Sequence, residues 1–402
     1  MNLEKNDMNE PVVPNPTGMT DEATQLEPFD FFDRKRSDGH LHWDEHTGRW
    51  DVFSYEANKR VLGDPKAFSS QSPLPTDQQN LIGDTFFNSD PPEHGKKRGV
   101  VEDFFTSEAV NAYEPMIRET AQSLFDDIES KGEMDAVGDL AYPLPVIIIA
   151  NILGVPPEDR DQFKKWADLL IKAETTSVDD LVADQKRAGT EMASYFLDII
   201  ERRQEEPKDD LISILTQAEI DGEPISEGDM LGYCALMLIA GNITTTGFIG
   251  NCIRCFGNYD DENLFETLSD DRDGLDRAIE EVARYRSSVP AAGRVATRDM
   301  ELYGKSISEG DFVLTWPMAA NHDPAKFDSP GEFIPSRSPN PHIAFGYGVH
   351  SCIGGSLARL ETRVALEVMM ERLDDIRVIT DDLTPIENTF MHAVESLPVE
   401  FN

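Results

Sequence analysis

The stretch Phe345-Gly-Tyr-Gly-Val-His-Ser-Cys-Ile-Gly354 places one cysteine, Cys352, shortly after a glycine-rich turn. Gly346 and Gly348 allow the backbone to turn sharply and to approach a flat ligand, which any Cβ would obstruct. Cys352 stands at the start of a helical pattern over residues 353–373, where the helix dipole lowers the pKa of a thiol. An inert cysteine of the core does not need this setting. The stretch therefore indicates a cysteine thiolate that binds a metal ion.

The pattern Phe-Gly-x-Gly-x-His-x-Cys-x-Gly resembles the haem-binding loop of the cytochrome P450 superfamily, and its length makes it specific. The resemblance implies that Cys352 is the proximal ligand of a haem iron and that His350 contacts a haem propionate. A glycine-rich turn with a buried cysteine would not account for the whole pattern. The other residues of the pattern that would hold the cofactor are Phe345, Gly346, Gly348 and Gly354.

The chain is strongly acidic, with 76 aspartates and glutamates against 36 lysines and arginines in 402 residues and a formal net charge of −40. Nucleic acids and anionic membranes require a positive surface, so binding to either is not expected. Concentrated salt screens the repulsion among surface carboxylates. The composition therefore predicts a soluble protein from a salt-adapted, halophilic organism, and the resemblance is to the soluble prokaryotic type of the superfamily.

Residues 1–28 are polar, acidic and proline-bearing, and they contain no apolar run typical of a signal peptide. We expect a disordered leader over these residues. No repeat or linker divides the remainder, which predicts a single catalytic domain over residues 29–402. The four cysteines do not make a disulfide framework in a chain of this size.

Residues 230–256 form the longest apolar stretch, and its length alone would suit a transmembrane helix. Its middle is polar and would be costly in lipid, so a long helix buried in a large soluble domain fits better. The stretch is similar to the family's central helix, which crosses the distal haem face. The resemblance implies that Gly241 leaves room for O2 and that Thr244, with Thr245 beside it, supplies a hydroxyl there. Ile243 replaces the acid that the family usually carries.

His94 and Arg98 lie four residues apart in a predicted helix and therefore share one face of it. Taken alone, they would be interpreted as surface charge. By resemblance they hold a haem propionate, together with Arg294 in a later strand. Lys96 and Lys97 complete a small basic island on an acidic chain. In the family, this face receives an acidic electron donor.

Glu281 and Arg284 share one face of an amphipathic helix predicted over residues 275–285. In most proteins such a pair lies at the surface and contributes under ~1 kcal/mol. In the family the same Glu-x-x-Arg pair is buried and binds a further arginine before the haem loop, and Arg337 matches this residue. The implied role is folding and haem retention, because a buried charge must stay paired.

The substrate pocket is expected to be apolar. The loop over residues 69–87 carries many apolar side chains for a loop, which suggests a lid or a pocket wall. A strand over residues 288–295 and a strand pair over residues 390–399 would complete the pocket. The expected lining residues are Phe86, Phe87, Ile239, Ala240, Val289, Ala291 and Met391.

We therefore predict a mainly α protein with a small β portion, in which haem b lies between a long central helix and the cysteine-loop helix. The resemblance implies a haem-thiolate monooxygenase that inserts one atom of O2 into a small lipophilic substrate. No flavin or nicotinamide motif is present, so the electrons would come from a ferredoxin-type donor and its reductase. The protein is expected to be a cytoplasmic monomer.

Two alternatives stay open. The first is a haem-thiolate enzyme of the peroxygenase or isomerase type, which the missing acid at Ile243 favours and the presence of Thr244 opposes. The second is a non-enzymatic haem-binding sensor, which would not need the predicted pocket-lining loops.

Overall fold

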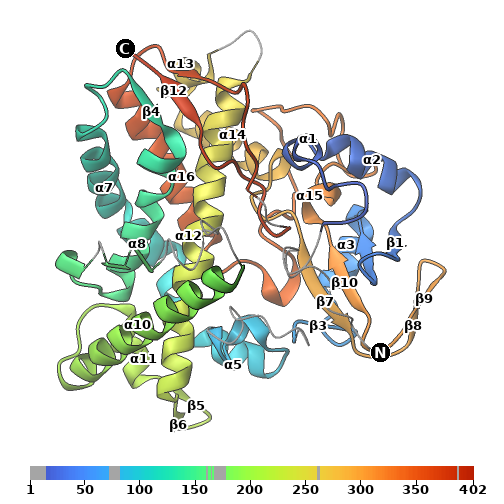
Figure 1. Cartoon of the computed structure of the whole chain (residues 1–402), viewed down its shortest axis with the longest axis horizontal. Coiled ribbons are helices and arrows are strands. Elements are labelled where there is room, and N and C mark those ends of the chain that lie inside the picture. Colours follow the sequence, from blue (N-terminus) through green and yellow to red (C-terminus); the bar gives the residue numbers. More distant parts are fainter. Residues whose placement is uncertain are drawn as a thin grey trace.

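The computed structural model describes residues 15–71, 82–159, 162–163, 165–166, 178–259, 263–386 and 389–402, with the backbone alone over residues 178–186. Helices make up most of its regular structure, and the strands form small sheets, so the predicted class is confirmed. Figure 1 shows the longest helix, α12 (Glu227–Gly257), running through the middle of the molecule between other helices and the largest sheet.

The helices surround α12 and carry most of the core. The further α-helices are α1 (Glu22–Leu26), α2 (Phe29–Ser37), α3 (Tyr55–Leu62), α5 (Glu93–Gly99), α6 (Ser107–Ala112), α7 (Glu114–Asp126), α8 (Pro143–Leu153), α10 (Val178–Glu205), α11 (Leu211–Gln217), α13 (Leu264–Leu268), α14 (Arg272–Tyr285), α15 (Pro317–Ala320) and α16 (Gly355–Arg372). Short helical turns of other types are η1 (Phe86–Asn88), η2 (Glu102–Phe105), η3 (Ala136–Ala141), η4 (Pro157–Asp159) and η5 (Gly348–His350).

The largest sheet has five strands in the order β1-β2-β10-β7-β3. Its strands are β1 (Leu41–Asp44), β2 (Arg49–Val52), β3 (Phe68–Ser69), β7 (Ala292–Ala296) and β10 (Phe312–Thr315). The β10–β2 pair is parallel, and the others are antiparallel. The smaller sheets contain β4 (Glu133–Asp135), β11 (Arg377–Val378) and β12 (Pro398–Glu400), β5 (Glu219–Ile220) and β6 (Glu223–Pro224), and β8 (Met300–Leu302) and β9 (Lys305–Ile307).

Helix α12 begins at a capping box. The Ser226 hydroxyl accepts a hydrogen bond from the backbone N–H of Asp229, whose carboxylate accepts one from the N–H of Ser226. A helix that is apolar on all sides must be buried, and α12 packs against α8, α14 and α16. Residues 136–153 and α12 are both long and apolar enough to cross a membrane. However, 78% and 72% of their most apolar 18-residue segments are buried inside the protein. This burial is typical of core helices.

The N-terminal segment differs from the prediction. Residues 15–28, expected to be disordered, include helix α1 and the buried side chain of Met19. The Glu27 carboxylate lies 2.8 Å from Nη2 of Arg254 and 2.6 Å from Nη2 of Arg286, which anchors the segment. The prediction of disorder is therefore wrong for these residues, because two arginines far along the chain share this carboxylate. Residues 1–14 lie outside the described residues.

Candidate active site

The cysteine loop depends on glycines in the left-handed region. Gly346 has a φ of +79° and Gly348 has a φ of +80°, and residues with a side chain rarely adopt such backbone angles. A Cβ on Gly348 would also lie 2.9 Å from the carbonyl oxygen of Leu62. The backbone N–H of Cys352 donates to the Phe345 carbonyl over 2.8 Å and closes the loop. The turn leaves the Cys352 side chain exposed, immediately before α16.

The thiol of Cys352 has a raised pKa, so the prediction of a lowered pKa is wrong for the protein alone. Water reaches the side chain, but the enclosing protein still reduces its hydration, and this desolvation disfavours the thiolate. The backbone N–H groups of Gly354 and Gly355 and the charges of Arg359 and Arg98 act in the opposite direction. These groups would support a thiolate once a metal ion replaces the proton.

Phe345 joins the cysteine loop to the central helix. Its ring packs edge-on against Phe248 of α12, with ring centroids 5.8 Å apart. The Arg359 guanidinium of α16 lies 4.0 Å from the centroid of the same ring. Phe345 therefore holds the loop and both helices in one arrangement.

Helix α12 has an accessible face in the middle of its buried length. Ala240 is exposed, and Gly241 and Thr244 are partly exposed, although Asn242 and Thr245 are buried. We call Ala240, Gly241 and Thr244 the open face. The Thr244 hydroxyl donates to the Ala240 carbonyl over 2.8 Å, which leaves its oxygen lone pairs available as acceptors. Thr245, predicted beside Thr244 in the site, is buried away from this face.

Gly241 lies on the open face of α12. The space around it would also admit a side chain. A Cβ there would be 3.6 Å from Ile149 of α8, which is an ordinary contact. Ile243 is partly buried and carries no group that could transfer a proton. The open face therefore has a single hydroxyl group, that of Thr244.

Four cationic or histidine side chains come together from three segments. The rings of His94 (α5) and His350 (η5) are 4.3 Å apart, and Arg98 donates to the Ser351 carbonyl over 2.8 Å. Arg294 (β7) and Arg98 lie near enough to His350 to lower its pKa, after burial as the main cause, to about 3. Burial likewise lowers the pKa of Arg294 to about 10. We call these four residues the cationic cluster.

The cationic cluster has unused hydrogen-bonding capacity. Among the described residues, Nε2 of His94 and Nε2 of His350 are buried without a hydrogen-bond partner. The hydrogen bond recorded for Arg294 goes to the carbonyl of its neighbour Gly293, over 2.7 Å. Buried polar groups of this kind are expected to meet a ligand. Donors and positive charge beside an accessible cysteine fit the carboxylates and the iron of a haem group.

The predicted basic island is largely neutralised by the chain itself. Nζ of Lys96 lies 3.0 Å from Glu93 and 2.6 Å from Asp221 in the β5–β6 hairpin. Nζ of Lys97 lies 2.5 Å from Asp84. The net positive charge of the island is therefore smaller than the sequence suggested. The sequence did not indicate this, because Asp221 and Asp84 belong to segments outside α5.

The ion-pair network is present and buried. Glu281 and Arg284 are both 0% exposed, and their side chains meet in two hydrogen bonds of 2.8 Å. Nε of Arg337 lies 3.0 Å from both carboxylate oxygens of Glu281. Arg284 also donates to the carbonyls of Asn321 and Pro330, which fixes the segment before the cysteine loop.

The predicted pocket residues separate into two groups. Ile239 and Val289 are partly buried, Ala240 belongs to the open face, and Met391 approaches α12 at Gly247, where a Cβ would lie 3.4 Å from its methyl carbon. The remaining members do not line this space as expected. Phe86 packs against His94 and Tyr233, Phe87 is 50% exposed, and Ala291 is 1% exposed in a core cluster with Trp316.

Sequence reasoning missed Glu361 on α16. Its carboxyl group is 3% exposed, its Oε2 has no partner among the described residues, and burial raises its pKa to about 8. Helical spacing carries the signal, since Glu361 lies four residues after Leu357 and four before Ala365, both on the buried face. An acid at such a position is protonated at neutral pH.

Comparisons with known proteins agree with this geometry. A family model described as Cytochrome P450 matches residues 269–400. Cytochrome P450 109 of Bacillus spizizenii is 39% identical over 384 residues, covering 94% of this chain and 93% of that protein. Erythromycin C-12 hydroxylase of Saccharopolyspora erythraea is 34% identical over 369 residues, covering 91% of each.

Solved structures are similar as well. Substrate-free CYP109E1 from Bacillus megaterium has a TM-score of 0.88 at 37% identity and covers 94% of this chain and 99% of that one. The complexes of CYP109E1 with corticosterone and with testosterone have TM-scores of 0.87 and 0.85. The chain therefore belongs to the cytochrome P450 family, whose members are haem-thiolate monooxygenases that use haem iron and O2. It is accordingly an enzyme, a P450 monooxygenase.

Proposed function

We propose that this enzyme binds haem b and hydroxylates a small lipophilic molecule, drawing electrons from a ferredoxin-type donor and its reductase. The observation that carries the proposal is the accessible Cys352 beside a cationic cluster with two unpartnered imidazole nitrogens. We further propose a soluble, monomeric, cytoplasmic protein of a salt-adapted organism, in keeping with the formal charge of −40.

The residues that would bind the cofactor come from three segments: the cysteine loop, α5 and β7. Cys352 would supply the thiolate ligand, and His94, Arg98, Arg294 and His350 would hold the propionates. When bound, haem supplies the activation of O2. Glycines 346, 348 and 354 would keep the loop close to the cofactor plane, because the first two adopt a positive φ.

Thr244 would hold and pass protons on the distal side. The acid of the family is absent, and Asn242 and Thr245 are buried, so none of these side chains reaches the open face. We infer that protons arrive through water at the exposed Ala240 side of α12 and are accepted by the Thr244 hydroxyl. Proton transfer by a positioned group typically contributes 10²–10⁴-fold in rate.

The substrate class follows from the apolar lining and from the relatives. Ile239, Ala240, Val289 and Met391 offer carbon and sulfur atoms rather than charged groups. CYP109E1, which is 37% identical, has been crystallised with two steroids, corticosterone and testosterone. We therefore propose lipophilic molecules of about steroid size as substrates.

The electron donor would dock on the face that carries the cysteine loop. Tyr347 and Val349 of this loop are each 38% exposed, and Nζ of Lys59 lies 4.4 Å from the centroid of the Tyr347 ring. Lys96 and Lys97 lie on α5 and would attract an acidic donor, although their own carboxylate partners weaken the attraction.

The second candidate function is that of a peroxygenase, which would use peroxide in place of O2 and the electron donor. The presence of Ile243 in place of an acid favours it. Hydrogen peroxide brings its own two protons and two electrons, and one of its oxygen atoms would enter the product while the other leaves as water. An enzyme without an acid before Thr244 would therefore not depend on proton delivery when it uses peroxide. An isomerase of the same haem-thiolate class would make product without either oxidant.

The decisive experiment combines spectroscopy with turnover. The reduced holoenzyme should show the red-shifted CO band of a thiolate-bound haem, and Cys352→Ser should lose it. NADH with ferredoxin and its reductase should yield an oxygenated product from a bound lipophile. An unchanged CO band in Cys352→Ser would contradict the ligand assignment, and product formed only with peroxide would favour the second candidate.

A further inference from the structure

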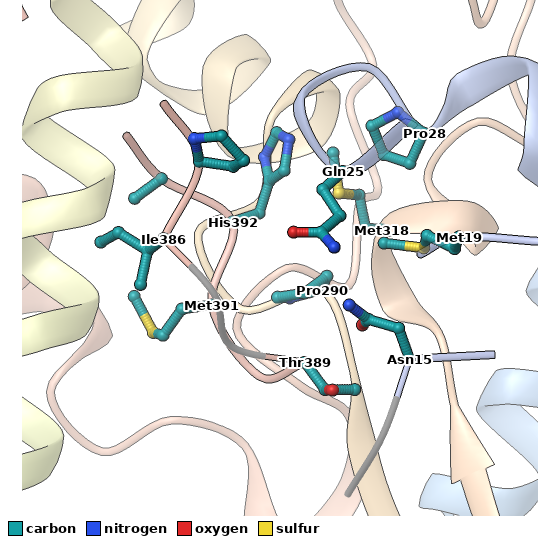
Figure 2. Close-up of a pocket in the computed structure, with 12 residues that line it drawn as sticks. Asn15, Met19, Gln25, Pro28, Pro290, Met318, Ile386, Thr389, Met391 and His392 are labelled. Atoms are coloured by element: carbon teal, nitrogen blue, oxygen red, sulfur yellow. The ribbon is translucent and has the colours of Figure 1, made fainter. Parts of the chain in front are cut away.

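A small cavity lies between the N-terminal segment, the loop before β7 and the C-terminal loop; we call it the N-terminal pocket (Figure 2). Its lining includes Asn15, Gln25, Pro290, Met318, Met391 and His392. The enclosed volume of about 10 Å³ is near the lower limit for one water molecule. In its present form the pocket therefore accommodates one small polar group, beside prolines, methionines and the four polar residues Asn15, Gln25, Thr389 and His392.

Met391 separates this pocket from the central helix. A Cβ on Gly247, one turn after Thr244, would lie 3.4 Å from the methyl carbon of Met391 and 3.3 Å from Cβ of Ala393. Figure 2 shows Met391 on the α12 side of the pocket, with Gln25 and Pro28 on the other side. An unbranched thioether adopts several conformations at low cost, so Met391 can connect the pocket to the substrate space.

The lining carries donors in the side-chain amides of Asn15 and Gln25, but its buried atoms without a partner among the described residues are hydrogen-bond acceptors. Nε2 of His392 lies 3.3 Å from the carbonyl oxygen of Leu26, and a carbonyl can only accept, so Nε2 carries the hydrogen. Burial, with Arg286 and Arg254 nearby, lowers the pKa of His392 to about 3, so the ring is neutral and Nδ1 is an acceptor. Among the described residues Nδ1 of His392 and Oδ1 of Asn15 are buried without a partner.

The two acceptors without a partner indicate which chemical group a ligand would place in the pocket. A buried acceptor left unpaired costs stability, so a donor is expected to meet it. An ammonium group is disfavoured, because the nearby guanidinium groups of Arg254 and Arg286 would repel it. A carboxylate offers no hydrogen at neutral pH. A neutral hydroxyl carries one hydrogen and no net charge, so it can meet one of these acceptors without either cost.

We propose that the N-terminal pocket receives the hydroxyl group of a lipophilic ligand whose apolar body lies along the open face of α12. Met391 moves aside, and the hydroxyl donates to His392 Nδ1 or to Asn15 Oδ1. This inference rests on the proposed function and refines its substrate class. The enzyme prefers lipophiles that carry a hydroxyl remote from the carbon that is oxidised.

The test compares testosterone with the deoxy analogue that lacks its hydroxyl group, by spectral titration of the ferric holoenzyme. One hydrogen bond typically contributes about 1 kcal/mol, so testosterone should bind roughly five- to tenfold more tightly. A merely apolar pocket would favour the deoxy analogue, because it is the more hydrophobic of the two. Because one hydroxyl donates to one acceptor, the preference should fall to near unity in His392→Phe or in Asn15→Ala, and in the double variant. Met318→Leu, which changes the lining but no acceptor, should retain it.

Equal binding of the two steroids to the wild type would overturn the inference, and so would a preference that survives both acceptor substitutions. Asn15→Ala removes only a peripheral side chain, and where His392→Phe fails to fold, His392→Leu takes its place as the second acceptor variant. The proposed function is tested separately, by measuring the oxygenated product that the enzyme forms from the deoxy analogue with NADH and ferredoxin. Product from this analogue without a hydroxyl preference would overturn the pocket assignment alone, whereas binding of neither steroid would contradict both.

Discussion

Glu281 and Arg284 meet in two parallel hydrogen bonds of 2.8 Å, from Nε and Nη2 of the guanidinium to the two carboxylate oxygens, with both side chains fully buried. The same carboxylate also accepts from Nε of Arg337 at 3.0 Å. Two guanidinium groups therefore depend on one anion. The network connects α14 with the segment that leads into the cysteine loop.

Removal of the Glu281 carboxylate should strongly destabilise the protein. Glu281→Ala leaves Arg284 buried and unpaired, and breaking a buried pair from one side costs about 3–5 kcal/mol. We expect a large fall in the urea midpoint and in the haem content of the purified protein. Asp276→Ala on the same helix is the control, because Asp276 lies 3.5 Å from Arg363 but is 50% exposed, so its loss should cost about 1 kcal/mol or less. Equal losses in the two variants would contradict the assigned role.

Glu361 should make stability depend on pH. Burial raises its pKa from 4.5 to about 8, so between these values the folded protein keeps a proton that the unfolded chain releases. The free energy of unfolding should therefore fall as pH rises from about 4.5 towards 8. Glu361→Gln should remove this part of the dependence, whereas Glu119→Gln, at an exposed site on α7, should not. Parallel pH profiles for wild type and Glu361→Gln would refute the prediction.

Thr244 should determine how efficiently electrons become product. Thr244→Ala removes the only hydroxyl of the open face, so we expect NADH consumption to continue while most of it yields hydrogen peroxide. The measurement is product formed per NADH consumed. Thr246→Ala is the matched control, because this buried hydroxyl donates to the Asn242 carbonyl at 3.1 Å, on another side of α12. Wild-type coupling in Thr244→Ala would remove Thr244 from the proton path.

Lys96 and Lys97 should affect the encounter with the donor rather than the chemistry. The double substitution to alanine should slow ferredoxin-driven turnover at low salt by severalfold, because rim charges act mainly on the association rate. The pairing with Glu93, Asp221 and Asp84 argues against a larger effect. Peroxide-driven turnover serves as the control and should not change. A parallel decline of both rates would point to a damaged site instead of weakened docking.

Salt should stabilise the protein. Seventy-six acidic residues against 36 basic ones repel one another, and this repulsion is screened within about 3 Å at 1 M salt. Thermal unfolding of the holoenzyme should therefore show a midpoint that rises from low KCl to molar KCl. Sodium chloride at the same ionic strength should act equally, since screening does not depend on the cation. A flat or falling midpoint would contradict the predicted salt adaptation.

The sequence was most informative where chemistry is local. The sharp turn at Gly346 and Gly348 and the burial of α12 could be predicted, because glycine spacing and apolar length encode them. Glu281 and Arg284 could be placed on one helix face for the same reason. Their burial required a family resemblance, since an isolated i, i+3 pair is usually exposed.

Contacts between distant segments could not be predicted in the same way. Lys96 meets Asp221, 125 positions away, and no local pattern indicates that pairing. The orientation of Thr245 depends on which side of α12 is open, and this is decided by packing rather than by composition. The raised pKa of Cys352 likewise results from enclosure by protein that only the fold assembles.

The shared use of Glu27 by Arg254 and Arg286 has a practical consequence for expression. A gene shortened to begin at Phe29 would look harmless, since it would discard only a polar leader. It would instead leave two largely buried guanidinium groups without this carboxylate and expose the side of the pocket formed by Gln25 and Pro28. Shortened versions of the enzyme are therefore best begun before residue 15, and purification tags are best placed at the far end.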